Sequence, residues 1–342
     1  MHVDLISVIV PCYDESETLP EFYRRVCAVA KSLGRRFEFV FVNDGSRDET
    51  AAVLDELAER DRRVKVVHLA QNRGHQIALT AGMDHASGDM VVTIDADLQD
   101  PPELIGEMLS RIEEGFDVVH AQRDSRAGET VFKLATARLF YVMMRRMTGG
   151  RVIENCGDFR AFSRPVLEVI CHFREPHRFM RGLFSEVGFR QCVVTYDRDP
   201  RHAGDTKYPL HKMIRFAVDA VFSFSAAPIR LILGLSAALW LLSLLYLAKT
   251  LYEKFVLEIT VPGWVSLIVL MTFLTGLILF SLAVIGAYVG RIFEQGQRRP
   301  LYWVSETRNV EQGSVVRVAT DEPRPVRPSG DLPPPQEQRR LG

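Results

Sequence analysis

The sequence lacks several features that would each assign it to a familiar class. Its 42 Lys and Arg residues nearly balance its 43 Asp and Glu residues, so no basic excess indicates nucleic-acid binding. Its five cysteines are scattered, without C-x-x-C or paired spacing, which disfavours a disulfide framework and a zinc site. Residues 1–10 are short, contain Asp4 and indicate a strand rather than a signal peptide. We therefore expect reduced thiols in a cytosolic compartment.

The first 125 residues alternate β-branched runs with amphipathic stretches. Near-continuous apolar strands separated by helices indicate an α/β domain with a parallel sheet covered on both faces. Such sheets bind ligands at the carboxyl ends of their strands. The predicted strands are Ile6–Val10, Phe37–Val42, Val64–Leu69, Met90–Ile94 and Asp117–Ala121, and the predicted helices lie near Glu17–Ser32, Asp48–Arg60, His75–Ala86 and Pro101–Glu114.

The fourth predicted strand ends in two aspartates, Asp95 and Asp97, followed by Pro101 and Pro102 at the start of a helix. Alternate side chains of a strand share a face, so these two carboxylates can converge just past its end. Two such groups repel each other unless a cation lies between them, and oxygen ligands suit Mg²⁺ or Mn²⁺. The pair predicts a metal–diphosphate site. For a lone D-x-D, a solvated turn that caps a helix is the alternative.

Three other strand ends carry polar or glycine-containing turns. The first continues as Pro11–Glu15, the second as Asn43–Asp48 and the third as Gln71–His75. Each alone could be an ordinary turn or helix cap. Because all four ends are expected at one edge of one sheet, together they predict a crevice for a nucleotide diphosphate.

The order P-x-Y-x-E, N-D-G-S-x-D-x-T and D-A-D-L-Q-D-P-P-E resembles the family 2 glycosyltransferases with the nucleotide-sugar-binding GT-A fold, over residues 5–210. The similarity is closer still to the polyprenyl-phosphate glycosyltransferases, including the bactoprenol glucosyltransferase and dolichol-phosphate-mannose-synthase-like branches. Two departures, Asp14 where Asn is usual and His75 where Lys is common, leave the identity of the donor open.

The resemblance assigns roles to residues around the crevice. It implies that Asp95, Asp97 and Gln99 carry the metal, Mg²⁺ or Mn²⁺, and that Asp97 and Asp158 are the catalytic residues. Asp158 lies in Asn155–Arg160, which we predict to be a turn, and it could act as a base or only orient the acceptor. The residues implied to bind the nucleotide-sugar donor are Pro11, Tyr13, Glu15, Asp44, Asp95, Arg201 and Lys207, the last two in a mobile basic loop.

The acceptor side is less sharply defined. The resemblance singles out Arg123 and Lys133 as ligands of the phosphate of a lipid acceptor, since Arg can bind phosphate in a bidentate manner. The alternative is that these two residues belong to a solvated basic surface without a ligand. A phosphate monoester is already anionic at neutral pH, so a strong general base is not required.

Two long apolar runs follow the catalytic domain, each about the roughly 20 residues needed to cross a bilayer as a helix. Between domain and spans, Leu210–Phe224 reads as an amphipathic helix that either packs on the domain or lies in the membrane interface. The predicted parts are a GT-A domain at 1–209, an amphipathic helix at 210–227, spans at 228–252 and 264–290 joined by an extracytoplasmic loop at 253–263, a juxtamembrane segment at 291–309 and a disordered tail at 310–342.

Basic residues flank the two spans on their outer sides. Lys212 and Arg215 precede the first span, and Arg291 and Arg298 follow the second. By the positive-inside rule both flanks are cytoplasmic, so we predict a two-helix transmembrane hairpin with the domain and both termini in the cytoplasm. Small residues in the second span make a homo-oligomer plausible.

The sequence therefore predicts an enzyme of the plasma or inner membrane that transfers one sugar to polyprenyl phosphate, most simply from UDP-glucose to undecaprenyl phosphate. The resemblance implies that the reaction inverts the anomeric centre of the sugar. UDP-galactose, a UDP-amino-sugar and GDP-mannose are alternative donors. A phosphotransferase using Asp95 as nucleophile would leave Asn43–Thr50 unexplained. Two spans and the lack of Q-x-x-R-W disfavour a processive polysaccharide synthase. A non-catalytic membrane scaffold is the alternative from another class.

Overall fold

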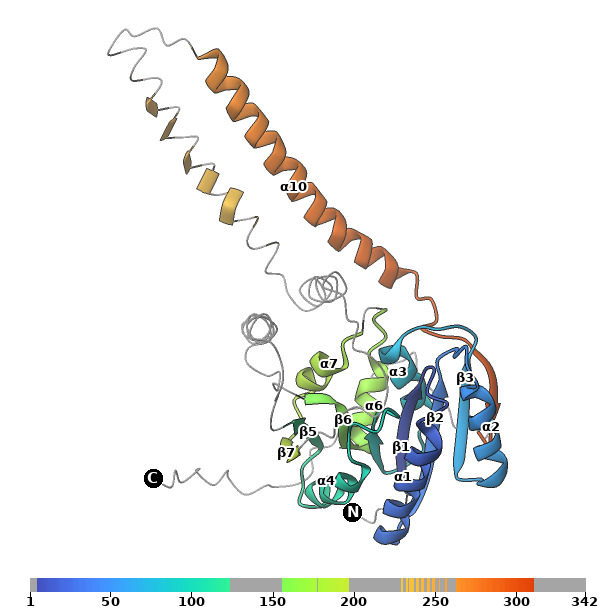
Figure 1. Cartoon of the computed structure of the whole chain (residues 1–342). Coiled ribbons are helices and arrows are strands. Elements are labelled where there is room, and N and C mark those ends of the chain that lie inside the picture. The colour runs from blue at the N-terminus through green and yellow to red at the C-terminus, as the bar shows by residue number, and fades with distance from the viewer. Residues whose placement is uncertain are drawn as a thin grey trace, which may run out of the picture.

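A computed structural model describes residues 5–123, 156–176, 178–196 and 263–310, with individual positions between 229 and 256 (Figure 1). Several predictions concern residues outside this part of the chain. These are Lys133, Arg201, Lys207, the amphipathic helix at 210–227, most of the loop at 253–263 and nearly all of the tail at 310–342.

The described strands form one eight-stranded sheet in the order β7-β5-β6-β4-β1-β2-β3-β8. Strands β3, β2, β1 and β4 are parallel neighbours, whereas β6 runs antiparallel between β4 and β5, and β8 runs antiparallel along β3. This sheet confirms the predicted α/β class with mostly parallel strands. The strands are β1 Leu5–Cys12, β2 Arg36–Asn43, β3 Val64–Leu69, β4 Met90–Thr93, β5 Val118–Arg123, β6 Cys156–Ser163, β7 Gln191–Tyr196 and β8 Val304–Arg308.

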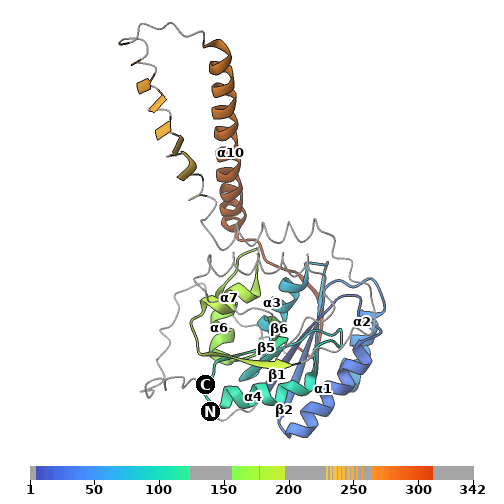
Figure 2. The same cartoon turned by 60° about the vertical axis from the view of Figure 1, so that its left-hand side comes forward.

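Helices cover both faces of the sheet (Figures 1 and 2). Helices α1, α2 and α4 share one apolar cluster with the strands, and α3, α6 and α7 share another. The helices are α1 Leu19–Leu33, α2 Thr50–Arg60, α3 His75–His85, the short 3₁₀ helix η1 Pro102–Leu104, α4 Ile105–Glu113, α6 Arg164–His172, α7 Met180–Glu186 and α10 Trp264–Gly296.

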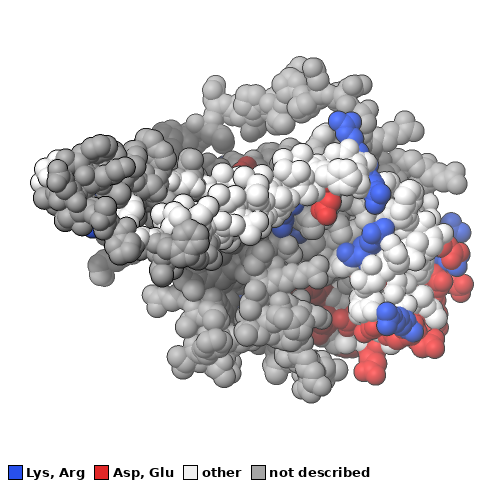
Figure 3. Space-filling view, turned by 90° about the horizontal axis from the view of Figure 1, so that it is seen from above, with Lys and Arg blue, Asp and Glu red and all other residues white. Residues whose placement is uncertain are grey.

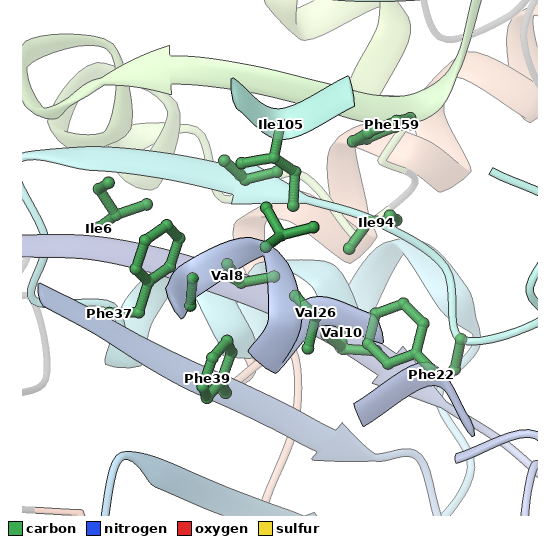
Figure 4. Close-up of a cluster of buried hydrophobic side chains, with 14 of the residues drawn as sticks. Ile6, Val8, Val10, Phe22, Val26, Phe37, Phe39, Ile94, Ile105 and Phe159 are labelled. Atoms are coloured by element: carbon green, nitrogen blue, oxygen red, sulfur yellow. The ribbon is translucent and has the colours of Figure 1, made fainter. Parts of the chain in front are cut away.

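The larger cluster shows how the sequence pattern becomes a core. Phe22 and Val26 lie one helical turn apart on the buried face of α1, and both side chains are fully inaccessible to solvent. They face Val8 and Val10 of β1, which alternate with residues on the opposite side of the sheet (Figure 4). Full burial of an aliphatic or aromatic side chain of this size stabilises a fold by roughly 1.5–3 kcal/mol.

On the other face, α3 lies unusually close to the central strand β1. A Cβ atom built on Gly82 would overlap Cγ2 of Ile9, so only glycine fits at this contact. The close approach fixes the depth at which α3 sits, and α3 begins at the edge of the sheet where the polar strand ends meet.

One local prediction was wrong. Asn155–Arg160 was expected to be a turn, but residues from Cys156 onward belong to β6, and Asp158 lies inside that strand. The pattern misled because Asp158 and Arg160 are polar yet buried, with 9% and 1% of their surfaces exposed. They tolerate burial because they are hydrogen-bonded to each other and to neighbouring groups.

The long helix α10 projects away from the sheet domain (Figures 1 and 2). It has no charged residue from Trp264 to Gly290, and apolar side chains such as Leu279 and Phe273 are 62% and 59% exposed. Within the described residues it provides one stretch, Phe273–Gly296, that is long and apolar enough to cross a membrane. Figure 3 shows the charged side chains of the described residues gathered toward the sheet domain.

After α10 the chain returns to the sheet. Strand β8 pairs with β3 from Val66↔Arg308 to Leu69↔Val304, and the Ala70 N–H donates a 2.9 Å hydrogen bond to the Trp303 carbonyl. The sequence predicted no strand here, because Val304–Arg308 is mostly polar and its residues are exposed. A short polar strand of this kind is typical of a sheet edge.

Candidate active site

A cavity of about 600 Å³ opens at the carboxyl ends of β1, β2 and β4. The chain passes from β1 to β2 on one side, whereas β4 pairs with β1 on the other, so the cavity lies where the strand order reverses. Six of the residues that line it were predicted from the sequence to bind the donor or the metal, and the others were not. The lining residues are Pro11, Cys12, Tyr13, Glu15, Asp44, Asn72, Gly74, His75, Ala78, Asp95, Ala96 and Asp97.

Asp44 holds the turn after β3 against the turn after β2. Its two carboxylate oxygens accept hydrogen bonds from the N–H groups of Arg73 and Gly74 at 2.7 and 2.8 Å. Next to it, Gly45 has φ of 65°, and a Cβ there would lie 2.6 Å from the Asn72 nitrogen. Burial raises the pKa of Asp44, an effect that the two hydrogen bonds oppose. Asp44 therefore shapes the rim of the cavity.

The turn after β1 is also held in place, by hydrogen bonds to residues that follow β2. Asp14 adopts a left-handed conformation with φ of 55°, which Asn and Asp tolerate better than most residues. Its carboxylate accepts a 2.8 Å hydrogen bond from the Arg47 N–H. The Glu15 N–H donates to the Thr50 hydroxyl at 2.9 Å. The Asp14 departure thus has a local structural role, and the turn holds Tyr13, which is 39% exposed, at the cavity.

Asp95 and Asp97 follow β4 and line the cavity, as the sequence predicted. The Oδ1 atom of Asp95 is buried and has no hydrogen-bond partner among the described residues, whereas Oδ1 of Asp97 accepts a hydrogen bond from the Gln99 N–H at 3.1 Å. Burial, together with the charges of Asp158, Asp100 and Asp97, raises the pKa of Asp95 to about 6, although the charge of His75 opposes this increase. A carboxylate oxygen that accepts no hydrogen bond and lies among other carboxylates favours a cation.

The backbone immediately after Asp97 is strained. Leu98 has φ of 61°, a region that costs a residue with a Cβ atom roughly 1–2 kcal/mol. Its side chain is 93% buried in the core cluster, which offsets this cost. No three His, Cys, Asp or Glu side chains among the described residues are arranged to hold a metal alone. Asp95 and Asp97 could supply two oxygen ligands of a divalent cation, whose other ligands would have to come from elsewhere.

Asp158 enters the same region from β6 and is surrounded by donors. Its Oδ2 accepts hydrogen bonds from His75 Nε2 at 3.1 Å and Gln76 Nε2 at 3.0 Å. Its Oδ1 accepts one from Arg160 Nη2 at 3.0 Å and lies 3.9 Å from Arg181 Nε. Burial raises the pKa of this carboxyl, but His75 and the two arginines hold the pKa well below its usual range. Asp158 is therefore a carboxylate at neutral pH.

His75 lies between the two acidic groups. Its Nε2 is 3.1 Å from Asp158 Oδ2 and 3.6 Å from Asp95 Oδ1. Burial lowers the pKa of the imidazole, but the hydrogen bond with Asp158 and the charge of Asp95 raise it to about 9. His75 thus places a positive charge at a position where the family commonly has Lys. In the sequence, His75 was noted only as a departure from this family pattern.

Arg123 lies beside the site but has partners within the protein. Its Nη2 is 3.6 Å from Oδ1 of Asp100, and its Nε donates to the Tyr196 hydroxyl at 3.2 Å. The Tyr196 hydroxyl in turn donates to Asp100. About a quarter of the Arg123 side chain, 27%, is exposed. The structure therefore leaves one edge of Arg123 available to a ligand and does not describe Lys133.

The sequence missed three residues of this region: Gln76, Arg160 and Arg181. No local motif marks Gln76, because its role depends on strands far away in the chain. Arg181 lies in the basic segment Arg174–Arg181, which carried no recognisable pattern. Arg160 is buried with its guanidinium 4.4 Å from the ring centre of Phe184, a contact invisible in the sequence.

With this geometry established, comparisons with known proteins identify the class. The Glycosyl transferase family 2 model matches residues 7–171. The chain is 44% identical over 306 residues to an uncharacterized glycosyltransferase of Synechocystis sp., which covers 90% of this chain and 96% of that protein. It is 37% identical over 303 residues to the bactoprenol glucosyl transferase of Shigella phage SfV, covering 89% and 99% of the two chains.

The chain therefore belongs to glycosyl transferase family 2, and the protein is a glycosyltransferase, as the motifs predicted. Family and sheet together confirm the GT-A-like α/β fold. Among solved structures, it is similar to glucosyl-3-phosphoglycerate synthase from Mycobacterium tuberculosis, with 22% identity, a TM-score of 0.45 and coverage of 64% and 76% of the two chains.

Proposed function

We propose that the protein transfers one sugar, glucose from UDP-glucose in the first instance, to undecaprenyl or another polyprenyl phosphate at the cytoplasmic face of the membrane. Relatives of nearly equal length are named bactoprenol glucosyl transferases, which supports this acceptor and this sugar. The observation that carries the proposal is the buried Asp95 Oδ1, which accepts no hydrogen bond from the described residues and lies in a cavity at the strand ends. A carboxylate so placed suits a metal-bound sugar diphosphate.

In this proposal the cavity binds the donor. Pro11, Tyr13, Glu15 and Asp44 would line the nucleoside end, and Asp95, Asp97 and Gln99 would hold Mg²⁺ or Mn²⁺. Such an ion supplies positive charge to the departing nucleoside diphosphate. Arg201 and Lys207, outside the described residues, would add charge at the donor phosphates.

On the acceptor side, Arg123 and Lys133 would bind the lipid phosphate. A phosphate oxygen attacks the anomeric carbon while the bond from that carbon to the diphosphate breaks, which inverts the anomeric centre. The attacking oxygen is already anionic, so no proton has to be removed. Asp158, whose pKa is held low by His75, Arg160 and Arg181, therefore orients neighbouring groups rather than accepting a proton.

The sheet also bears on the membrane topology. Strands β7 and β8 belong to the same sheet although the apolar region lies between them in the chain, which supports an even number of membrane crossings in the intervening segment. The proposal takes α10 as one crossing and includes a second. The described positions from 229 to 252 are helical, and Leu241 and Leu245 are 56% and 61% exposed, which supports the proposed span at 228–252.

This even parity agrees with a hairpin whose flanks, together with both chain termini, are cytoplasmic. Among the described residues, no atom lies within 4 Å of where a Cβ would stand at Gly276, Gly286 or Gly290 of α10, which is compatible with close packing against a neighbouring helix, and hence with a homo-oligomer. The proposal includes no nucleic-acid partner.

A panel of nucleotide sugars tests the donor and the reaction together. Membranes carrying wild-type protein or Asp97→Ala receive undecaprenyl phosphate, Mg²⁺ or Mn²⁺, and one radiolabelled donor each: UDP-glucose, UDP-galactose, a UDP-amino-sugar or GDP-mannose. We expect label in the organic-extractable lipid from UDP-glucose with wild type and its loss in the variant. If label reached the lipid from one of the other donors only, the sugar of that donor would replace glucose in the proposed reaction. Donor binding without any transfer would favour a non-catalytic scaffold.

A further inference from the structure

The side-chain amide of Gln76 joins three separate elements. Gln76 is the second residue of α3, and its Nε2 donates a 3.0 Å hydrogen bond to Asp158 of β6, 82 positions later. Its Oε1 accepts a 2.8 Å hydrogen bond from the backbone N–H of Met180, the first residue of α7, 104 positions later. Both ends of one amide are thus used in connecting α3, β6 and α7.

The Met180 contact is a helix cap supplied from another element. Phe179, at the N-cap position of α7, makes no side-chain capping bond. The first N–H groups of a helix have no partner within the helix, so Gln76 Oε1 satisfies one that would otherwise lack it. Because α7 carries Arg181, one residue after Met180, this contact also fixes the start of the turn that brings Arg181 within 3.9 Å of Asp158.

The orientation of the amide is determined by its two partners. A flipped amide would point its NH₂ group at the Met180 N–H and its oxygen at the Asp158 carboxylate, and both contacts would be repulsive. Gln76 therefore presents a donor to Asp158 in one orientation only. Gln76 is not among the residues lining the donor cavity, whereas His75, which hydrogen-bonds the same oxygen, is.

We propose that Gln76 is a positioning residue: it fixes the Asp158 carboxylate and the first turn of α7 relative to each other, and so sets the geometry of Asp158 and Arg181 at the acceptor side. This inference rests on the proposed function, in that Asp158 is taken to serve sugar transfer. It assigns to Gln76 an effect on the rate of transfer and none on donor binding.

Three variants separate the two hydrogen bonds. Gln76→Glu keeps an acceptor for Met180 but places a second carboxylate against Asp158. Gln76→Met has a similar length and loses both contacts. The double variant Gln76→Glu/Asp158→Asn restores a donor–acceptor pair with the negative charge moved from residue 158 to residue 76.

Gln191 provides a matched control. Its amide also bridges two elements, since Nε2 donates to the Phe184 carbonyl at 2.7 Å and Oε1 lies 2.9 Å from His120 Nε2, but it does not contact Asp158. Gln191→Met therefore removes a comparable amide bridge, and this bridge includes neither Asp158 nor Arg181.

Transfer to undecaprenyl phosphate and thermal unfolding are measured on the full-length protein in detergent. We expect Gln76→Glu to lower kcat by about 100-fold and Gln76→Met by about 10-fold or more, with KM for the donor within about threefold of wild type. The double variant should regain the thermal stability lost in Gln76→Glu but not kcat, and Gln191→Met should lower stability with kcat close to wild type.

Two results would overturn the positioning role. One is a kcat within about threefold of wild type in both single Gln76 variants. The other is full recovery of kcat in the double variant, which would mean that the carboxylate at residue 158 is not required. Absence of transfer by the wild-type protein, measured first in the same assay, would instead overturn the proposed function and the catalytic effect of Gln76 with it.

Discussion

The hydroxyl of Tyr302 donates a 2.7 Å hydrogen bond to Oδ2 of Asp84, 218 positions earlier in the chain. Asp84 is buried near the end of α3 and also accepts two 2.8 Å hydrogen bonds from Arg174. The segment that follows the long apolar helix is thus tied to the helix whose first turn contacts Asp158. The described residues 301–310, after α10, are consequently part of the sheet domain.

We predict that Tyr302→Phe destabilises this domain. The variant removes one donor to a buried carboxylate, and hydrogen bonds to charged groups contribute about 1.5–3 kcal/mol. Chemical denaturation in detergent, followed by tryptophan fluorescence, measures the change. The neighbouring Trp303→Phe is the control by thermal unfolding, because Trp303 is 59% exposed and its side chain should contribute little. Equal stability of Tyr302→Phe and wild type would show that the contact is not formed in solution.

The first four strands and helices could be predicted closely from the sequence. The strand at Val64–Leu69 was predicted with its observed bounds, and the others differ by a few residues. Apolar β-branched runs and amphipathic helices are local sequence patterns, so they can be recognised without knowledge of the fold. Strand β8 escaped prediction because an exposed edge strand needs no apolar face, and its pairing partner lies more than 200 residues away.

The contact between α3 and β1 leads to a second prediction. Gly82→Ala would force a methyl group into Ile9, and overpacking of a core costs typically about 1–3 kcal/mol. We expect a lower unfolding temperature and reduced transfer, since α3 carries His75 and Gln76. Gly106→Ala in α4 serves as control: its nearest neighbour would be the Leu33 side chain at 3.2 Å, which can move. If both variants unfold at the same temperature, the close packing of α3 is refuted.

A third prediction concerns stability in acid. The Asp48 carboxylate accepts hydrogen bonds from the N–H groups of Ser16 at 3.2 Å and Thr50 at 3.0 Å. Burial raises the pKa of Asp48, but the hydrogen bonds from Ser16 and Thr50 together outweigh burial and lower the pKa from 3.8 to about 2. The folded state therefore favours the carboxylate, and this stabilisation is present above about pH 4 and is lost as pH falls toward 2.

Thermal unfolding of wild type and Asp48→Asn between pH 6 and pH 2 tests the Asp48 contribution. The variant should be less stable at pH 6, and the difference should shrink as pH falls below about 4. Glu49→Gln, at the neighbouring exposed position, should follow the wild-type profile. A difference between wild type and Asp48→Asn that is constant over the whole range would contradict the assignment.

A fourth prediction places the two ends of α10 on opposite sides of the membrane. Gly263 precedes the helix and Gln297 follows it. With a membrane-impermeant maleimide, Gly263→Cys should react in intact spheroplasts and Gln297→Cys only after permeabilisation, with wild-type protein reporting the background of its five cysteines. Labelling of Gln297→Cys alone in intact spheroplasts would invert the proposed topology.

The site was predictable as far as local motifs extend. Asp44, Asp95 and Asp97 follow strands directly, so their convergence in one cavity followed from the parallel sheet. Asp158 was singled out only through resemblance, and its placement in a buried strand was not foreseen. The partners of Asp158 could not be predicted, because His75, Gln76 and Arg181 reach it from helices whose packing depends on contacts such as Gly82 with Ile9.

The central claim is the coupled transfer of sugar to a lipid phosphate, and product stoichiometry tests it most directly. Purified protein with UDP-glucose, undecaprenyl phosphate and Mn²⁺ is assayed for UDP release and for glucosylated lipid, then again with excess EDTA. We predict one UDP for each glucosyl lipid, no product of either kind without the polyprenyl phosphate, and a loss of both with EDTA that added Mn²⁺ restores. UDP release without a lipid product, or transfer unaffected by EDTA, would contradict the account.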